Sequence, residues 1–273
     1  MDVLMLIPAS LIVLALGASI GSFINVVVYR IPAGLSVIFP PSRCPHCLNQ
    51  LKAYDNVPVL GWFWLKGRCR YCKSKISIRY PVVEVFAALL FLLVFWVFQY
   101  SPFTLGYWIF CSWLLALSLI DFDTMTLPNP LTKSGLVLGV LFQTVLGFQS
   151  DSLSGVCYQL YGAVVGAVVG IWLFDAISFV GSVIFQKEAM GGGDAKLAAM
   201  MGAWLGWKLL LLAVFLSCIM GVLAGGSGVI LKNRKWGKKM PFGPCLALGS
   251  VITLFGGENI ISSYLKLFFW QSM

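Results

Sequence analysis

The sequence predicts an all-α polytopic membrane protein with about eight transmembrane helices and one small polar module. Composition is the first reason: 59% of the 273 residues are hydrophobic and only 11% are charged. A soluble domain carries about 25% charged residues, so this chain has too few to cover a water-facing surface. The second reason is a series of apolar runs of about 20 residues, which match the thickness of a bilayer. The third is that the basic residues gather in a few segments between these runs.

Seven apolar stretches supply the predicted helices. In chain order they cover about residues 5–28, 81–98, 102–120, 131–148, 158–185, 195–231 and 241–273. The sixth stretch exceeds one span, and the glycines of Gly202–Gly206 predict a break into a short helix and a full one. The seventh can hold one long span or two short ones, with Gly256-Gly257-Glu258 as the predicted break. We therefore expect eight spans, with seven as the alternative.

The net charge of +9 is distributed unevenly along the chain. If residues 30–80 are cytoplasmic, alternation of the spans places 121–130, 186–196 and 232–240 on the same side. These segments, with Lys133 at the edge of one, hold 17 of the 19 Lys and Arg residues. The positive-inside rule then predicts an external N-terminus. The charge thus indicates a lipid bilayer rather than nucleic acid as the partner.

The chain is expected to have three parts: a first span (1–29), a cytoplasmic tetracysteine module (30–80) and a membrane-embedded core (81–273). Within the module, the pairs Cys44/Cys47 and Cys69/Cys72 have the spacing C-x2-C-x21-C-x2-C. Two such pairs can complete a tetrahedral Zn²⁺ shell of the zinc-ribbon type. Disulfides are rare in the cytoplasm, which favours structural zinc over a redox or metal-free state. Four thiolates fill the shell, so His46 is expected to be a bystander.

His46 is also the only histidine, so the sequence disfavours a Ser-His-Asp or Cys-His catalytic mechanism. Among the ten acidic residues, Asp121 ends the third predicted span, and Asp194 follows three glycines at the start of the next short helix. Both are expected at one membrane face. Two close carboxylates share a proton, so one can activate water while the other protonates a carbonyl. Two helix-terminal caps are the alternative interpretation, and the pattern favours Asp121 over Asp123 only modestly.

Asp175 is predicted to lie about ten residues inside the fifth span. At 1.5 Å per residue this is roughly 15 Å from the end of the helix. An acid at that depth is costly unless it is hydrogen-bonded or functional, and both interpretations stay open.

Seven segments carry a resemblance that extends almost from end to end of the chain. They are Gly21–Pro32, Ser42–Cys47, Tyr54–Leu60, Arg79–Glu84, the segment that follows Leu119-Ile120, Gly191–Leu197 and Pro241–Pro244. In this order they resemble the type IV prepilin peptidase family. Its members are leader peptidase/N-methyltransferases of type IV pilus and type II secretion systems, and are membrane aspartyl proteases of the GxGD type.

The resemblance implies that Asp121 and Asp194 are the catalytic aspartates. It implies cleavage of leader peptides from prepilins or pseudopilins at the cytoplasmic face of the bacterial inner membrane. It also implies methylation of the new N-terminal amine by S-adenosylmethionine. The resemblance places this methyl transfer in the 30–84 region, where Asp55, Asn56 and Glu84 are candidate cofactor-binding residues. The alternative, which is given equal weight, is that these three side chains only cap helices and form hydrogen bonds within the loop.

The chain departs from the family pattern in two places. Asn129 follows Leu127-Pro128 where the family often has Asp, so an acid is not obligatory at this position. The stretch between the two aspartates is also longer than expected, and the extra length is assigned to the external loop near Asp151. The competing hypothesis from another class is a non-enzymatic assembly or ion-transport component that uses Asp175 and the two terminal acids.

Overall fold

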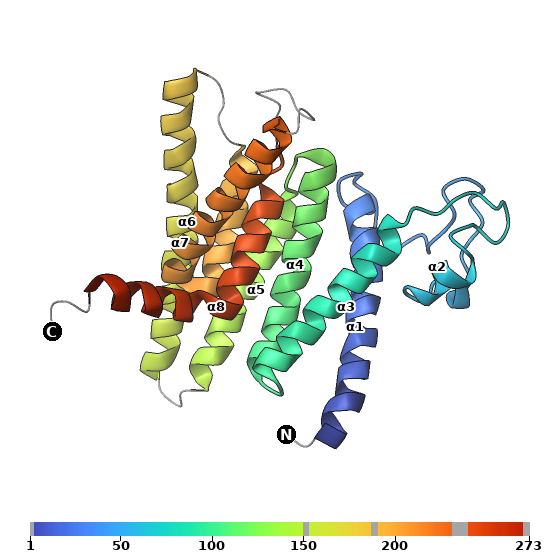
Figure 1. Ribbon diagram of the computed structural model, residues 1–273, viewed down its shortest axis with the longest axis horizontal. Helices are drawn as coiled ribbons and strands as arrows, with labels where there is room; N and C mark the ends of the chain where they lie inside the picture. Colours follow the sequence, from blue (N-terminus) through green and yellow to red (C-terminus); the bar gives the residue numbers. More distant parts are fainter. Residues whose placement is uncertain (1–2, 150–152, 187–190, 231–239, 270–273) are drawn as a thin grey trace. The chain divides into compact units, whose positions relative to one another are not determined.

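The computed structural model describes residues 3–149, 153–186, 191–230 and 240–269 (Figure 1). These residues are almost entirely helical and contain no strand, only two isolated β-bridges. The chain divides into two compact units, Met1–Ala116 and Leu117–Met273. The helical membrane fold predicted from composition is confirmed.

The first unit joins two long helices to the cysteine module. Its elements are α1 (Val3–Arg30), η1 (Ala53–Asp55), α2 (Leu60–Trp64), α3 (Arg79–Phe98) and the first part of α4 (Pro102–Thr124). Helices α1 and α3 pack closely and antiparallel: a Cβ on Gly17 would meet the backbone of Ala88, and one on Gly21 would meet that of Glu84. In Figure 1 the module lies where α1 ends and α3 begins.

The second unit is a bundle of helices. It contains the end of α4, then α5 (Asn129–Phe148), α6 (Leu153–Phe185), α7 (Gly192–Ile230) and α8 (Gly243–Phe269). Glycines let α6 and α7 approach to backbone contact, with Gly166 against Gly202 and Gly170 against Ala198. Small residues at such a crossing are typical of membrane helices, because close backbone packing replaces the hydrophobic driving force.

Helix α7 breaks at Gly206, whose φ of 74° and ψ of 168° are not helical. A positive φ of this kind is readily adopted only by glycine. Just before the break, the Gln143 side chain donates to the carbonyl of Trp204 at 2.6 Å. The Trp204 indole in turn donates to the carbonyl of Gly135 at 2.8 Å. The predicted break within Gly202–Gly206 is therefore confirmed, and α5 holds it in place.

The two arms of α7 fold back on each other. The arm before Gly206 is antiparallel to α6, and the arm after it is antiparallel to α8, with Ser217 against Gly249. Phe242, just before α8, contacts both Gly221 of the second arm and the ring of Phe174 on α6. Both ends of α7 therefore lie on one side of this unit, as the charge distribution predicted for 186–196 and 232–240.

Seven helices of the described chain are long and apolar enough to cross a membrane. The eighth predicted span corresponds to the first arm of α7, residues 192–205. At 1.5 Å per residue this arm is about 21 Å long, short of the roughly 30 Å of a bilayer core. Seven of the eight predicted spans are therefore long enough to cross a membrane, and the remaining one is the short first arm of α7.

Of the two alternatives for the last stretch, the structure has the single long helix. Helix α8 continues through Gly256-Gly257-Glu258 without a break, although it bends in Figure 1. Gly257 packs against Leu209 of α7 there, so close helix contact accounts for this glycine. The loop near Asp151 and the basic segment 231–239 lie outside the described residues.

Candidate functional site

Asp121 is a buried carboxylate near the end of α4, with 6% of its surface exposed. Its Oδ2 accepts a hydrogen bond of 2.8 Å from the backbone N–H of Gly243, the first residue of α8. That N–H belongs to a helix N-terminus, where unpaired donors and the helix dipole favour negative charge. The start of α8 therefore orients one oxygen of Asp121.

Gly243 must be a glycine for this contact. A Cβ at this position would lie 2.8 Å from Oδ2 of Asp121 and 3.1 Å from its Cβ and Cγ. The Pro241–Pro244 segment matched the family by order alone, and its sequence did not assign Gly243 a role. The signal that could have found it is a glycine at the junction of a polar loop and an apolar helix.

Asp194 is the third residue of α7 and is half-buried. Its N–H donates to the carbonyl of Gly191 at 3.1 Å, which closes the first turn of the helix. Leu127 lies beside the preceding residue, 3.1 Å from the Cβ position of Gly193. Asp194 lies close enough to Asp121 for the two charges to interact, and the Asn129–Lys196 hydrogen bond joins the segments that follow them. The structure thus brings together the two acids singled out in the sequence.

Asp123 lies on the same helix as Asp121, but its side chain is exposed whereas that of Asp121 is buried. Burial therefore separates the two acids that sequence spacing distinguished only modestly. Asn129, at the position where the family often has an acid, accepts a 2.7 Å hydrogen bond from Nζ of Lys196. This bond joins the segments after Asp121 and Asp194, and an amide oxygen is sufficient to form it.

The Asp175 side chain is exposed on the surface of α6. Its neighbour Phe174 packs against Phe242, which directly precedes Gly243, with ring centroids 6.3 Å apart. Asp175 therefore lies level with the start of α8, and α6 continues past it to Phe185. Asp175 thus lies ten residues before the end of α6, which is the predicted position about 15 Å from the helix end, and its role stays a prediction.

The four module cysteines form one cluster, with all four Sγ atoms within 4.8 Å of one another. The Cys44–Cys72 sulfurs are 3.7 Å apart and the Cys47–Cys69 sulfurs 3.9 Å. These separations are too long for disulfides. In a tetrahedral shell with Zn–S bonds of about 2.3 Å, sulfurs lie about 3.8 Å apart. The donor set therefore fits Zn²⁺, and His46 is not part of the cluster.

The two Cys-x-x-Cys turns have the same backbone geometry. Cys44 N–H donates to Asn49 at 3.0 Å, and Cys69 N–H donates to Ser74 at 2.9 Å. Each first cysteine also accepts from the residue four positions later, Leu48 or Lys73, at 2.9 and 3.1 Å. Leu48 and Lys73 have φ of 58° and 59°. The module is thus built from two equivalent turns that face each other across the sulfur cluster.

Burial and hydrogen bonds shift the pKa values of the thiols in the cluster. Burial opposes ionisation of Cys44, but backbone and side-chain hydrogen bonds outweigh it and lower its pKa to about 6. For Cys47, the Asn49 backbone favours the thiolate, yet burial and the neighbouring cysteines raise the pKa to about 11. Four thiolates at this separation repel one another, and a divalent cation removes that repulsion.

The three candidate cofactor residues all line one cavity of about 680 Å³ between the module, α1 and α3. Two of them already have protein partners. The Asp55 carboxylate is paired with Arg70, which lowers the pKa of Asp55, and Glu84 accepts the Val59 N–H at 2.6 Å. The described residues offer no hydrogen-bond partner to the Asn56 side chain. Asn56 is therefore the candidate with unused hydrogen-bonding capacity.

Gly243→Ala is expected to reduce any activity of the acid pair by about 10²-fold, because the new methyl group displaces Asp121 by the order of 1 Å. The matched control is Gly256→Ala in the same helix, where the nearest atom to a Cβ is Ile260 Cδ1 at 3.8 Å. Equal activity of the two variants in a peptide-cleavage assay would show that the Gly243–Asp121 contact does not matter.

Comparison with known proteins covers nearly the whole chain. The N-terminal domain of bacterial A24 peptidases matches residues 15–98, and the type IV leader peptidase family matches residues 108–226. A protein of Pseudomonas putida named prepilin leader peptidase/N-methyltransferase is 39% identical, over 95% of this chain and 96% of its own. Proteins of that name from Stutzerimonas stutzeri (36%; 93% and 92%) and Aeromonas hydrophila (37%; 91% and 91%) are equally similar.

No solved structure matches the chain significantly. The sequence relatives nevertheless cover both the cysteine module and the helices that carry Asp121 and Asp194. The resemblance drawn from seven short motifs is thereby confirmed at the level of whole proteins, and the chain belongs to the type IV leader peptidase family.

Proposed function

We propose that this protein removes the leader peptide from type IV prepilins or pseudopilins and N-methylates the new N-terminal residue. The observation that carries the proposal is the meeting of Asp121 from α4 and Asp194 from α7, with Gly243 of α8 orienting the former. The names of the relatives, prepilin leader peptidase/N-methyltransferase, support both activities.

In the proposed reaction the two carboxylates hold one proton between them. The ionised carboxylate takes a proton from water, which attacks the scissile carbonyl, and the protonated one donates to the carbonyl oxygen. The Gly243 N–H favours negative charge on Asp121, so Asp121 is the proposed base and Asp194 the acid. The pair is expected to titrate as a unit.

We place the protein in the bacterial inner membrane, with its active site facing the cytoplasm. Three features support this orientation: the basic segments, the two ends of α7 on one side, and the acids near that side. The cysteine module would then lie in the cytoplasm, with Cys44, Cys47, Cys69 and Cys72 holding a structural Zn²⁺. The three-part division of the chain at residues 29 and 80 stays a prediction.

For the methyl transfer we propose that S-adenosylmethionine binds in the 680 Å³ cavity, a volume within the usual range for small-molecule sites. When bound, it supplies an electrophilic methyl group. Asn56 is the proposed direct contact, while Glu84 fixes the 57–59 loop against α3 and Asp55 fixes Arg70. Both acids also place negative charge near a cationic ligand.

Asn56→Ala is expected to weaken binding of S-adenosylmethionine roughly tenfold or less, the effect of one lost hydrogen bond. Equilibrium dialysis of the labelled donor against the whole protein in detergent measures this directly. Asn259→Ala on α8, another exposed asparagine, is the control. An unchanged dissociation constant for Asn56→Ala would remove Asn56 from the proposed site.

The function itself is tested by incubating the purified protein with a prepilin and following leader release by mass spectrometry. Addition of S-adenosylmethionine should then raise the mass of the product by one methyl group. A non-enzymatic assembly or ion-transport component would leave the prepilin intact.

A further inference from the structure

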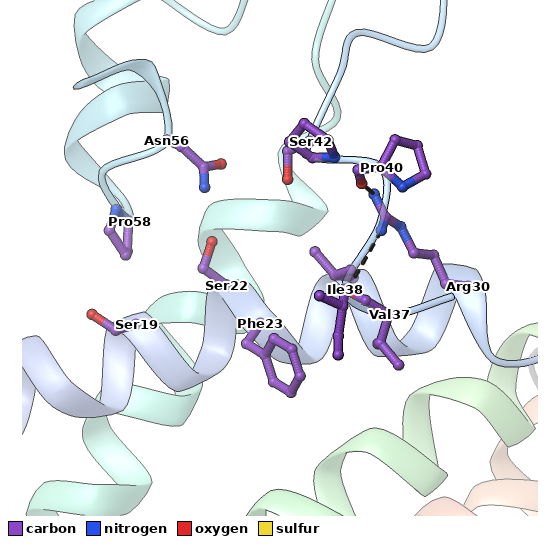
Figure 2. A pocket seen from close by; sticks show the side chains of 12 residues that line it. Ser19, Ser22, Phe23, Arg30, Val37, Ile38, Pro40, Ser42, Asn56 and Pro58 are labelled. Atoms are coloured by element: carbon purple, nitrogen blue, oxygen red, sulfur yellow. Dashed lines mark hydrogen bonds between the residues drawn. The ribbon is translucent and has the colours of Figure 1, made fainter. Parts of the chain in front are cut away.

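We propose that a second, smaller cavity beside the 680 Å³ cavity receives the first residue of the processed pilin, so that its amine meets the methyl donor. This inference rests on the proposed function. The smaller cavity has a volume of about 340 Å³ and lies between α1, residues 37–42 and residues 56–58 (Figure 2). It belongs wholly to the first unit.

The two cavities adjoin, because six residues line both. These are Ser22, Val26, Arg30, Pro40, Ser42 and Asn56. A methyl transfer requires the acceptor nitrogen and the donor methyl carbon to be held about 3–3.5 Å apart and in line. Separate but adjoining spaces for the two reactants meet this requirement. Binding of the methyl donor alone would require only one cavity.

The lining of the smaller cavity suits an apolar side chain that carries an amine. Its apolar members include Phe23 of α1 and Ile38 of the facing loop, neither of which lines the larger cavity. In Figure 2 the Ser22 hydroxyl and the Asn56 side chain point toward each other, and both residues also line the larger cavity. An apolar N-terminal residue would thus bury its side chain near Phe23 and keep its nitrogen near these polar groups.

The charges around the cavity favour the reactive form of the amine. Among the residues that the structure describes, no carboxylate lines it, and Arg30 is its only charged lining residue. Arg30 donates to the carbonyl of Ser36 at 3.0 Å and to that of Pro40 at 2.6 Å, and the second bond is drawn in Figure 2. These bonds hold the loop against α1. An α-amino group has a pKa of about 7.7–8.0 in water. Burial beside a fixed guanidinium disfavours its protonated form, and only the neutral amine is a nucleophile.

The reaction balances without any further reagent. The amine lone pair forms the new N–C bond while the C–S bond of the sulfonium donor breaks and its electron pair stays on sulfur. The products are a thioether and a methylated ammonium, which releases one proton to water. This chain's residues only hold the acceptor: Phe23 and Ile38 its side chain, Ser22 and Asn56 the region of its nitrogen.

The first test needs no methyl donor. An acceptor peptide with the mature pilin N-terminus, carrying p-benzoylphenylalanine as its first residue, is photolysed with the full-length protein in detergent. Crosslinks to Phe23, Ile38 or their neighbours in the smaller cavity are expected. Crosslinks confined to residues outside this cavity would overturn the proposal.

The second test compares variants in methylation of a peptide that begins with Phe. Phe23→Ala is expected to reduce kcat/KM by at least about tenfold through a higher KM, since it removes apolar contact with the acceptor. Ile38→Trp, which fills the cavity, should do the same. Leu16→Ala is the control: Leu16 is exposed on the same face of α1, two turns away, and lines neither cavity.

The outcomes separate the inference from the function on which it rests. Labelled S-adenosylmethionine should bind Phe23→Ala as it binds the wild type, and this binding reports that the first unit has folded, because the larger cavity belongs to the same unit as Phe23. If the wild type methylates but Phe23→Ala and Ile38→Trp behave like Leu16→Ala, only the acceptor site is wrong. If the wild type neither cleaves nor methylates, the proposed function fails together with it.

Discussion

Asp121→Asn and Asp194→Asn are each expected to lower leader cleavage by at least about 10³-fold, because each removes one member of an acid–base pair. The amide cannot take a proton from water or give one to the carbonyl, although it preserves the size of the side chain. The Asn variant of Asp121 can still accept from Gly243 N–H through its amide oxygen, so the start of α8 stays in place. The measurement is the single-turnover rate of leader release from a prepilin.

Asp123→Asn is the matched control, two residues from Asp121 on the same helix but with an exposed side chain. It should cleave at nearly the wild-type rate. Both catalytic variants should still methylate a peptide that already has the mature N-terminus, because the proposed methyl-transfer residues lie in the other unit. Normal cleavage by Asp121→Asn or Asp194→Asn would falsify the assignment of the pair.

Cys69→Ser is expected to remove zinc from the protein and to abolish methylation while leader cleavage persists. Cys69 is the most buried of the four cysteines, with 1% of its surface exposed, and both turns depend on the cluster for their mutual position. Structural Zn²⁺ contributes on the order of 10 kcal/mol of folding free energy in small zinc-dependent domains. Since the module forms part of both proposed cavities, its loss removes the methyl-transfer site.

Elemental analysis should find about one Zn²⁺ per chain in the wild type and none above background in Cys69→Ser. Cys157→Ser, in the exposed part of α6, is the control and should retain both metal and methylation. A strong chelator should reproduce the effect of Cys69→Ser on methylation. Metal content that is the same in Cys69→Ser and wild type would exclude the cluster as the zinc site.

The cysteine module was predictable from the sequence because its information is local. Each pair of ligands lies within one turn, and the x21 spacing left only the approach of the two turns to be found. Membrane spans were predictable for the same reason, since length and hydropathy are properties of contiguous residues. At Gly256-Gly257-Glu258 the sequence left one long span and two short ones open, and the structure has one long helix in which Gly257 serves helix contact. Local composition does not distinguish these two uses of glycine.

The acid pair was predictable only in part. The sequence and the family resemblance identified Asp121 and Asp194 as the candidate acids. They did not predict that Gly243, 122 residues from Asp121, would donate to its carboxylate. The role of Asn129 as an acceptor for Lys196, 67 residues away, was equally absent from the sequence pattern.

Composition, periodicity and short spacings are properties of contiguous residues, so they were sufficient to predict the membrane class, the cluster of four cysteines and the two candidate acids. Only the tertiary structure decided that Asp121 is buried and Asp123 exposed. It alone also decided that Gly243 donates to Asp121 and that two cavities adjoin beside Asn56. Each of these depends on how helices far apart in the chain pack together, and packing is selected by shape and backbone contact across the whole unit.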